Sequence, residues 1–467
     1  MPSIVYERFD VGLDVRRGAS VSDANRLRRL ENAYVTTGKS LQKRPGLTLI
    51  ATLEAGTVGL RGALGKLNTF YSNAGAAVTH ANTLFLANRV DHPTAPATQV
   101  AKVHYADAFL GFLYCAVEYT DGVVKHHYLD GTAPPLITDV NCPHGKGVTK
   151  IASKIWSTKG TTPYDTVRFC KTSTPRDWTA ASDAGFLAVG LQQEGAQNAY
   201  ALGQFQNYLV VYFNDSAQVW NVDPNPALCS LKQRIFGVGT RYPRGAASFA
   251  SDNFFLADVG VRSITLNQVT DNLQDTDVGT PVDTLLRPSI GSYEPVSIYL
   301  SAQGQYWLVL GATVWVYSFS RSSKISAWSK YSFPFTIDDV TQLDNVTYMR
   351  TGNSVYKLDP TKFLDNATRI NVSLELPFLD AKKPGILKQF IGADAVLAGN
   401  PLLILGVNPN DPTQVTEPMP VNGDTRAGNL TPVEVCAVSI SPRLYHSADE
   451  DFRLDLLQFH FEPLGTQ

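Results

Sequence analysis

The sequence is poor in charge of either sign, in methionine and in long hydrophobic runs. Of its 467 residues, 18% are charged and 3 are methionine, and the formal net charge is −2. This balance disfavours a tight nucleic-acid binder, because neutralising several phosphates needs a surplus of lysine and arginine. No run approaches the roughly 18 apolar residues that span a bilayer, and the N-terminus lacks a basic segment followed by an apolar one. We therefore expect a soluble chain, made in the cytoplasm, without stable membrane insertion.

Motifs that carry known chemistry are also missing. The five cysteines are widely spread and include no CxxC pair, which disfavours a disulfide framework and a zinc site. Gly65-Lys66 is not part of a phosphate loop, because Leu60 and Leu67 stand where that loop requires glycine and serine or threonine. The nucleophile motif Gly-x-Ser-x-Gly does not occur. The sequence therefore predicts a protein that is not an enzyme.

Two groups of potential metal ligands fall short of known motifs. Thiolate and imidazole suit zinc, but the candidate thiol and imidazole form a lone pair in a predicted turn. The candidate carboxylates for calcium lack the alternate spacing and the distant glutamate of a calcium loop. We interpret both groups as polar loops and predict no bound metal or cofactor. The first group is Cys142 and His144 with His126 or His127, and the second is Asp271, Asp275 and Asp277.

Residues that favour strands and turns are abundant. The chain has 20 tyrosines, 22 phenylalanines, 35 glycines and 27 prolines, and 44% of its residues are hydrophobic. Single hydrophobic cores usually stop growing at roughly 250–300 residues, so a chain of this length contains about two or three domains. We therefore expect a mainly β protein with more than one domain.

A regular rhythm of strand, turn and strand runs through the middle of the chain. Units of this kind recur about 40 to 53 residues apart, close to the ~40–50-residue period of propeller blades. The clearest strand pairs are residues 207–213 with 217–222, 306–310 with 313–317, and 346–349 with 354–358. The rhythm predicts a β-propeller of six or seven blades over residues 56–365, with Trp220, Trp307 and Trp315 buried in it. The units begin near Arg61, Lys102, Val148, Ala201, Gly245, Ser297 and Ile337.

The two ends of the chain lie outside this rhythm. Short strand patterns at 370–376, 402–405, 433–440 and 452–456 indicate a β-sandwich-like platform. Ser20 and Asp23 form a possible capping box, and the spacing of Ala24, Leu27, Leu30 and Tyr34 predicts one short N-terminal helix. We expect residues 1–55 and 366–467 to build one platform domain into which the propeller is inserted. The opposite helix face, with Arg26, Arg28 and Arg29, is either solvated or a contact with another subunit.

Several short motifs are shared with a known family of virion proteins. Residues 9–46 resemble the N-terminus of the tail nozzle proteins, also called tail tubular protein B, of short-tailed bacteriophages. Motifs in the predicted propeller and near the C-terminus resemble related virion proteins. The matching motifs are Gly12-Leu13, residues 28–32, Gly38 and Lys43-Arg44-Pro45-Gly46; residues 167–169 with Asp177-Trp178; residues 259–263; and residues 377–380 with Lys388.

This resemblance implies a structural protein of the virion tail. Such proteins form a ring, typically of six copies, at the distal end of the tail, and they close, extend and then open the channel through which genomic DNA leaves. They dock to an adaptor ring on the portal side and to tail fibres or spikes. DNA passes transiently and without specific binding, for which an acidic or neutral lumen is suited. The residues expected at an inter-subunit or adaptor interface are Arg26, Arg28, Arg29, Lys43, Arg44, Pro45 and Gly46.

A propeller that binds or cleaves glycans, as a receptor-binding protein or a glycosidase, is the alternative. Glycosidases need a pair of carboxyl groups about 5–10 Å apart. Asp338 and Asp339 are adjacent on a predicted strand, so their side chains point to opposite faces and cannot form such a pair by themselves. The repeated Ser-x-Asp-x-Gly-x-Thr-Trp turn of sialidase-like propellers is also absent.

Overall fold

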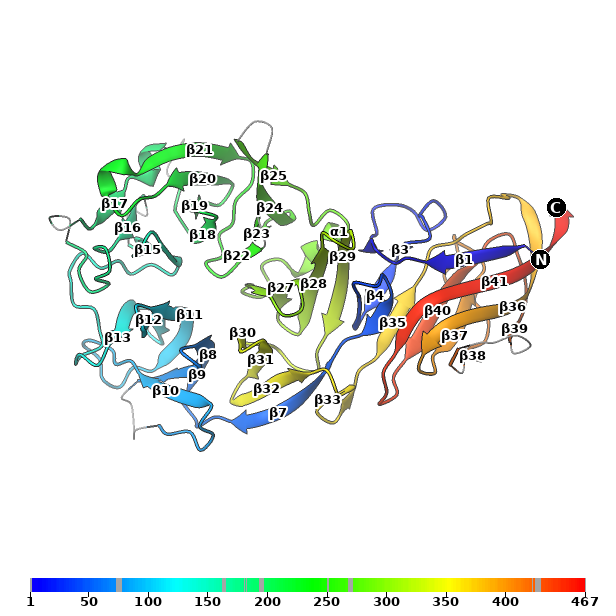
Figure 1. Ribbon diagram of the computed structural model, residues 1–467, viewed down its shortest axis with the longest axis horizontal. Coiled ribbons are helices and arrows are strands. Elements are labelled where there is room, and N and C mark those ends of the chain that lie inside the picture. The colour runs from blue at the N-terminus through cyan, green and yellow to red at the C-terminus, as the bar shows by residue number, and fades with distance from the viewer. Residues whose placement is uncertain are drawn as a thin grey trace.

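The computed structural model is almost entirely β-structure (Figure 1). It describes residues 2–72, 78–161, 165–179, 181, 183–192, 197–249, 252–267, 272–421, 423–424 and 430–466. Among these residues the one α-helix is α1 (Asp283–Leu286), a single turn. The mainly β class that the aromatic and turn residues predicted is confirmed. No helix in the described ranges is long and apolar enough to cross a membrane.

The predicted N-terminal helix between Ser20 and Tyr34 is wrong. The segment forms short strands instead: β3 (Arg26–Leu27), β4 (Arg29–Glu31) and β5 (Ala33–Val35). Leu27 and Leu30 are buried, as they would be on a helix face, but Asn32 takes a positive φ of 56° that interrupts the run. A helix of this length is marginal in water by itself. Pairing of β4 with strands far along the chain therefore decides the local structure.

Seven mostly antiparallel sheets follow one another through the middle of the chain, the sixth and seventh as parts of larger sheets, and most neighbours in them are consecutive strands. Sheets one to three contain β8 (Val58–Ala63), β9 (Lys66–Tyr71) and β10 (Phe85–Arg89); β11 (Val100–Phe109), β12 (Phe112–Tyr119) and β13 (Val124–Leu129); and β14 (Val148–Ile151), β15 (Lys154–Thr158), β16 (Val167–Phe169) and β17 (Gly185–Leu187). The one parallel pair in these three sheets is β10 with β9.

The remaining four sheets continue the series. They contain β18 (Ala201–Phe205), β19 (Tyr208–Tyr212), β20 (Ser216–Asn221) and β21 (Ser230–Phe236); β22 (Ala246–Phe249), β23 (Asp252–Ala257), β24 (Gly260–Asn267) and β25 (Asn272–Thr276); β26 (Val296–Leu300), β27 (Gln305–Leu310), β28 (Thr313–Ser320) and β29 (Ile325–Ser332); and β30 (Asp339–Leu343), β31 (Val346–Thr351) and β32 (Ser354–Asp359) with β7 (Gly46–Thr52).

The seven sheets are arranged in a closed ring around a common centre (Figure 1). The first strand of each sheet contacts the first strand of the next, in the order β8, β11, β14, β18, β22, β26 and β30, and β30 returns to contact β8. Each predicted unit start lies in, or directly before, one of these first strands. The three strand pairs predicted most clearly are formed by β19 with β20, β27 with β28, and β31 with β32.

A strand from the N-terminal segment completes the seventh sheet. β7 pairs antiparallel with β32, so that Leu47 lies opposite Leu358 and Gly46 opposite Asp359. The prediction assigned residues 1–55 to the platform, but β7 belongs to a sheet of the ring. The ring is therefore closed by hydrogen bonds between its last strand and a strand that precedes its first.

The platform is built from both ends of the chain. One of its sheets has the strand order β39 (Thr431–Ala437), β36 (Ile386–Ala398), β41 (Arg453–Thr466), β6 (Leu41–Lys43) and β5, with β1 (Ser3–Glu7) also on β41. The other has the order β4, β35 (Val372–Glu375), β40 (Ser441–His446), β37 (Leu402–Gly406) and β38 (Met419–Pro420). The short strands β33 (Leu364–Asp365) and β34 (Thr368–Arg369) extend the β7 sheet.

The second platform sheet is continuous with the sixth sheet of the ring. β29 pairs with β4 and with β2 (Gly12–Leu13), which makes one 11-stranded sheet from β26 to β38. One hydrophobic cluster extends from Tyr306 and Trp328 in the ring to Leu374 in the same sheet and to Phe390 and Phe459 in the first platform sheet. The tryptophans predicted to be buried, Trp220, Trp307 and Trp315, are at most 7% exposed. Ring and platform thus share a core.

Candidate functional site

Arg44, one of the predicted interface residues, is fully buried between ring and platform. Its guanidinium forms two hydrogen bonds with Asp365, of 2.7 and 2.5 Å, and Nε donates to Oδ1 of Asn32 at 3.0 Å. Nη2 also donates to the carbonyl of Ser332 at 3.0 Å, and the guanidinium lies 4.1 Å from the ring centre of Phe333. Arg44 therefore joins the N-terminal segment to β29 and β33 inside one chain. We call this contact between ring and platform, around Arg44 and Asp365, the joint.

Its neighbours Lys43 and Gly46 are buried at the same joint. Lys43 is 2% exposed, and its ammonium donates to the carbonyl oxygens of Ala448 and Glu450 at 2.7 and 3.3 Å. Burial lowers the pKa of Lys43 to about 8. The amide of Gly46 donates to the carbonyl of Lys362 at 2.7 Å. The side chain of Lys43 and the backbone of Gly46 contact the chain's own residues, so we assign both residues to the joint.

The three arginines of the predicted helix differ in their exposure and partners. Arg26 is partly buried and forms ion pairs with Asp14 and Asp23. Arg28 reaches back to donate to the carbonyl of Arg17 at 3.1 Å, and Arg29 is exposed. Arg28 and Arg29 are therefore the predicted interface residues that a partner can reach.

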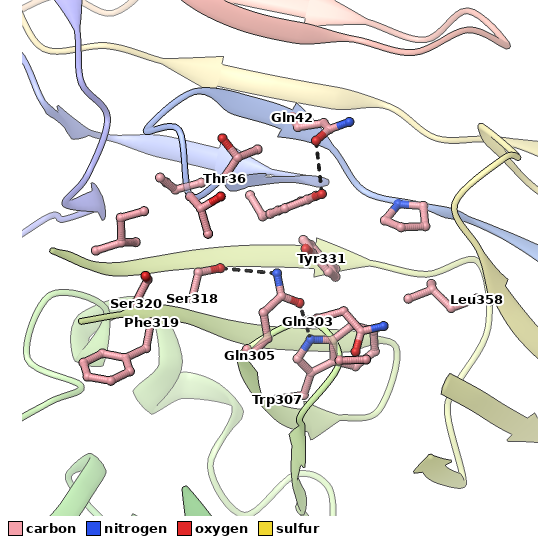
Figure 2. Close-up of a pocket in the computed structure, with 17 residues that line it drawn as sticks. Thr36, Gln42, Gln303, Gln305, Trp307, Ser318, Phe319, Ser320, Tyr331 and Leu358 are labelled. Atoms are coloured by element: carbon pink, nitrogen blue, oxygen red, sulfur yellow. Dashed lines mark hydrogen bonds between the residues drawn. The ribbon is translucent and has the colours of Figure 1, made fainter. Parts of the chain in front are cut away.

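A groove of about 380 Å³ lies where the β5 and β6 segment meets β27, β28 and β29 (Figure 2). Pro45 is part of its lining. Nε1 of Trp307 donates to Gln305 at 3.0 Å, and the amide of Gln305 donates to Ser318 at 3.3 Å. These bonds join lining residues to one another, and no charged side chain of the described residues lines the groove. The groove is therefore part of the contact between ring and platform.

The centre of the ring holds a different kind of cavity. About 330 Å³ in volume, it is lined by residues from the first strands of all seven sheets, and we call it the axial channel. Arg61, Lys150 and Arg244 are among its lining residues. Lys150 is neutralised by Asp107 at 2.7 Å. Arg61 and Arg244 belong to a deeper charge cluster.

This cluster consists of one buried carboxylate and three arginines. Oδ1 of Asp339 accepts hydrogen bonds from Arg61 at 2.9 Å and from Arg244 at 2.8 Å. Oδ2 accepts two from Arg350, at 3.1 and 2.9 Å. Burial alone would raise the pKa of Asp339, but the charges of Arg244, Arg61 and Arg350 outweigh it and hold the pKa well below its usual range. Asp338, the other member of the adjacent pair, is exposed, as strand alternation predicted.

A wider hollow of about 690 Å³, which we call the channel mouth, lies next to the axial channel and shares Lys146 and Pro243 with it. Segments that precede first strands supply Tyr200, Arg241, Tyr242 and Glu294 to its lining. The mouth thus combines aromatic rings with charges of both signs.

A histidine that is hydrogen-bonded to a carboxylate lies beside the mouth. Nε2 of His104 is 2.7 Å from Glu118, which also accepts from Lys146 at 2.8 Å. The hydrogen bond with His104, together with that from Lys146, outweighs burial and lowers the pKa of Glu118 to about 2. Burial lowers the pKa of His104 in spite of this partner. The group is a neutral histidine bonded to an ionised carboxylate at pH 7.

The two weak metal patterns gain no support. Within the described ranges, no group of three or more His, Cys, Asp or Glu side chains is placed to hold a metal. His126 bonds with Tyr114 at 2.7 Å and with the carbonyl of Gly145 at 2.9 Å. Asp277 pairs with Arg262 at 2.8 Å, while Asp271 and the side chain of Asp275 lie outside the described residues. All five cysteines are free.

The sequence patterns did not predict Asp339 with Arg61 and Arg244 as a site. Arg61 and Asp339 lie in first strands, and Arg244 comes just before one. The signal that could have found them is a charged residue at the start of a repeating unit, because the starts of all units converge on the ring centre.

No family model and no curated protein matches this sequence. Among the solved structures that it resembles is PorZ, described as an essential bacterial surface component of the type-IX secretion system of Porphyromonas gingivalis. The identity is 10% and the TM-score 0.32, and the likeness covers 56% of this chain and 32% of the PorZ chain. A likeness this small carries no conclusion on fold or function.

Proposed function

We propose that the ring is a seven-bladed β-propeller inserted into a β-sandwich-like platform. The support is the closed order of first strands, the meander connection within the sheets, and the completion of the last sheet by β7. Radial closure of this kind leaves short, protected sheet edges.

We further propose that the protein is a structural, non-enzymatic part of a short phage tail, of the nozzle type. The observation that carries this proposal is the joint around Arg44. The motif that resembles tail nozzle proteins supplies the buried arginine, which bonds with Asp365, and Gly46, which begins β7. A ring fixed rigidly to a platform suits a part that must keep its shape while DNA passes.

Other motif residues have the same kind of role. Gly12 has a positive φ of 68°, and a Cβ atom there would lie 2.7 Å from the carbonyl oxygen of Trp328. Only glycine allows β2 to approach β29 so closely. Lys388 is fully buried and donates to the carbonyl oxygens of Ile386 and Val438 at 2.9 and 2.7 Å. The resembling motifs therefore hold the architecture together.

We propose a homo-oligomeric ring, with six copies as the family suggests, that docks to an adaptor ring and to fibres or spikes in the virion. The platform offers surface for this assembly. β39 lies at one end of its first sheet, whereas β5 at the other end packs against β29, and an open sheet edge is a natural place for association. Ile391, Val396 and Leu464 are 38%, 43% and 56% exposed on the same sheet.

Assembly can be tested with a double charge reversal. Native mass spectrometry and electron microscopy of the purified chain, alone and added to tail particles that lack it, should detect a ring. Arg28→Glu with Arg29→Glu should reduce the assembled fraction at least tenfold, because both side chains are accessible. Arg89→Glu is the matched control, since Arg89 is an exposed arginine on the ring. A chain that stays monomeric and never joins tail particles would contradict the proposal.

The aromatic lining of the channel mouth favours glycan binding as a second candidate function. Tyr200, Tyr242 and Arg241 could stack on and bond to a sugar, as aromatic rings with a polar end commonly do. A glycan array with the wild type and Tyr200→Ala distinguishes the two functions. Saturable sugar binding that is lost in the variant, by a chain that forms no ring, would favour this candidate.

A further inference from the structure

The axial channel has cationic groups that no protein group neutralises fully. Three guanidinium groups, of Arg61, Arg244 and Arg350, surround the single carboxylate of Asp339. The only other carboxylate at this cluster within the described residues is that of Asp338, 4.0 Å from Arg350. Two negative charges thus face three positive ones. An uncompensated charge in a buried position is costly.

Arg244 carries the unused hydrogen-bonding capacity. It is 8% exposed and lines the axial channel. Its Nη2 donates to Asp339 at 2.8 Å, whereas Nε and Nη1 have no hydrogen-bond partner in the part of the chain that the structure describes. A guanidinium has five N–H donors in a fixed fork. Two nitrogens of a nearly buried arginine are therefore available to donate hydrogen bonds to a ligand inside the channel.

The positive charges of the cluster also act on Arg61. Burial, together with the nearby positive charge of Arg244, lowers the pKa of Arg61 to about 10. A negative charge beside both arginines would reverse this effect, because an opposite charge stabilises the charged form. An anion in the channel would therefore offset the repulsion between Arg61 and Arg244.

We propose that the axial channel binds a small oxyanion of the phosphate class, held by Nε and Nη1 of Arg244 beside Arg61. Guanidinium groups bind such oxygens through strong, charge-assisted hydrogen bonds. Lys150 lines the same cavity together with its partner Asp107, and the amide of Gln204 already donates to the carbonyl of Gln206 at 3.1 Å, so the guanidinium fork of Arg244 supplies the principal donors to the anion. The volume of about 330 Å³ leaves room for the ion and several waters, each of which takes about 30 Å³.

This site is independent of the role in a tail. It lies inside the ring of one chain and uses residues that none of the family-resembling motifs contain. If Arg244 were replaced, Asp339 would still pair with Arg61 and Arg350. The two carboxylates of Asp338 and Asp339 would then face two guanidinium groups, so the charges of the cluster would balance. We therefore expect Arg244→Gln to fold, with a melting temperature in phosphate-free buffer no lower than that of the wild type.

Calorimetric titration with inorganic phosphate at pH 7.5 and constant ionic strength tests the proposal. The wild type should bind one phosphate per chain, in competition with sulfate. Arg244→Gln should weaken binding at least tenfold, and Arg244→Lys, which keeps the charge but not the fork, should weaken it several-fold. Arg241→Gln, at the channel mouth, is the control and should bind phosphate as the wild type does.

Three results would overturn the proposal. One is the absence of saturable phosphate binding by the wild type, and another is unchanged affinity in Arg244→Gln. The third is a loss of affinity in Arg241→Gln with none in Arg244→Gln, which would place the anion at the mouth. Should Arg244→Gln not fold, the comparison of Arg244→Lys with the wild type still decides the matter, since equal affinities would contradict a role for the fork.

Discussion

Asp365 is the residue on which the buried charge of Arg44 depends. Asn32 and Ser332 offer Arg44 only neutral oxygen atoms, so Asp365 is the carboxylate that compensates it. Breaking a buried pair by removing one partner costs about 3–5 kcal/mol, because the remaining charge stays buried. The joint is therefore stable only with both members in place.

Asp365→Asn should lower the free energy of unfolding by about 3–5 kcal/mol, measured by urea denaturation. Asp91→Asn is the matched control, because Asp91 pairs with Arg89 at 2.8 Å with both side chains exposed. Such surface pairs contribute only about 0–1 kcal/mol. Equal effects of the two substitutions would show that Asp365 does not carry the joint.

Lys43 should make stability depend on pH in the alkaline range. Its pKa in the folded chain, about 8, lies below its ordinary value of 10.5. Between these values the unfolded chain binds more protons at this residue than the folded chain, so stability rises with pH. The free energy of unfolding of the wild type should therefore rise relative to that of Lys43→Met from pH 8 to 10.5. Lys362→Met, at an exposed lysine, is the control, and parallel profiles of wild type and Lys43→Met would contradict the prediction.

At the scale of elements, β7 is the strand that closes the ring, and Gly46 fixes its first residue. A Cβ atom on Gly46 would lie 2.2 Å from the carbonyl oxygen of Leu364 and 2.8 Å from that of Lys362. Both are backbone atoms, which cannot move aside as the end of a side chain can. Gly46→Ala should cost about 1–3 kcal/mol or more in urea denaturation.

Gly38→Ala is the control for this substitution. The nearest atom to its added methyl group would be Oγ1 of Thr36 at 3.6 Å, an ordinary contact. A change of less than about 0.5 kcal/mol is expected there, as for most surface substitutions. If Gly46→Ala were equally mild, the close approach of β7 to the segment around Leu364 would be unnecessary for stability.

The elements that sequence predicted well are those defined by neighbouring residues. The pair β19 and β20 follows from two short β-rich runs with Asn214-Asp215 between them, a local signal. The starts of the repeating strand units were predicted for the same reason, since each is marked by neighbouring residues. The N-terminal helix failed because β4 owes its conformation to Lys330 and Glu375, which lie about 300 or more residues away.

The candidate sites were also predictable only as far as neighbouring residues define them. Arg44 was singled out from its motif, but its partner Asp365 is 321 residues away, so burial and pairing could not be read from the sequence. Arg61 and Asp339 are 278 residues apart and meet only because β30 lies beside β8 when the ring closes. Pairings across a closure depend on the whole fold, which no local pattern encodes.

For the whole molecule, the shared core decides how the chain unfolds. A chain this long often unfolds in parts, since two-state behaviour holds mainly below about 150 residues. Here the 11-stranded sheet and one hydrophobic cluster run from ring to platform. Neither part can expose its side of this interface without exposing apolar surface of the other. Coupled unfolding is the expected consequence.

Native-state hydrogen exchange in increasing urea, read by mass spectrometry, tests this coupling. Slowly exchanging amides of β19 and β20 in the ring and of β36 and β41 in the platform should lose protection at the same urea concentration. Asp365→Asn should shift both sets together to lower urea, because the joint belongs to both. If β36 and β41 lost protection well before β19 and β20, the continuous sheet would not couple the two parts, and the platform would unfold as an independent unit.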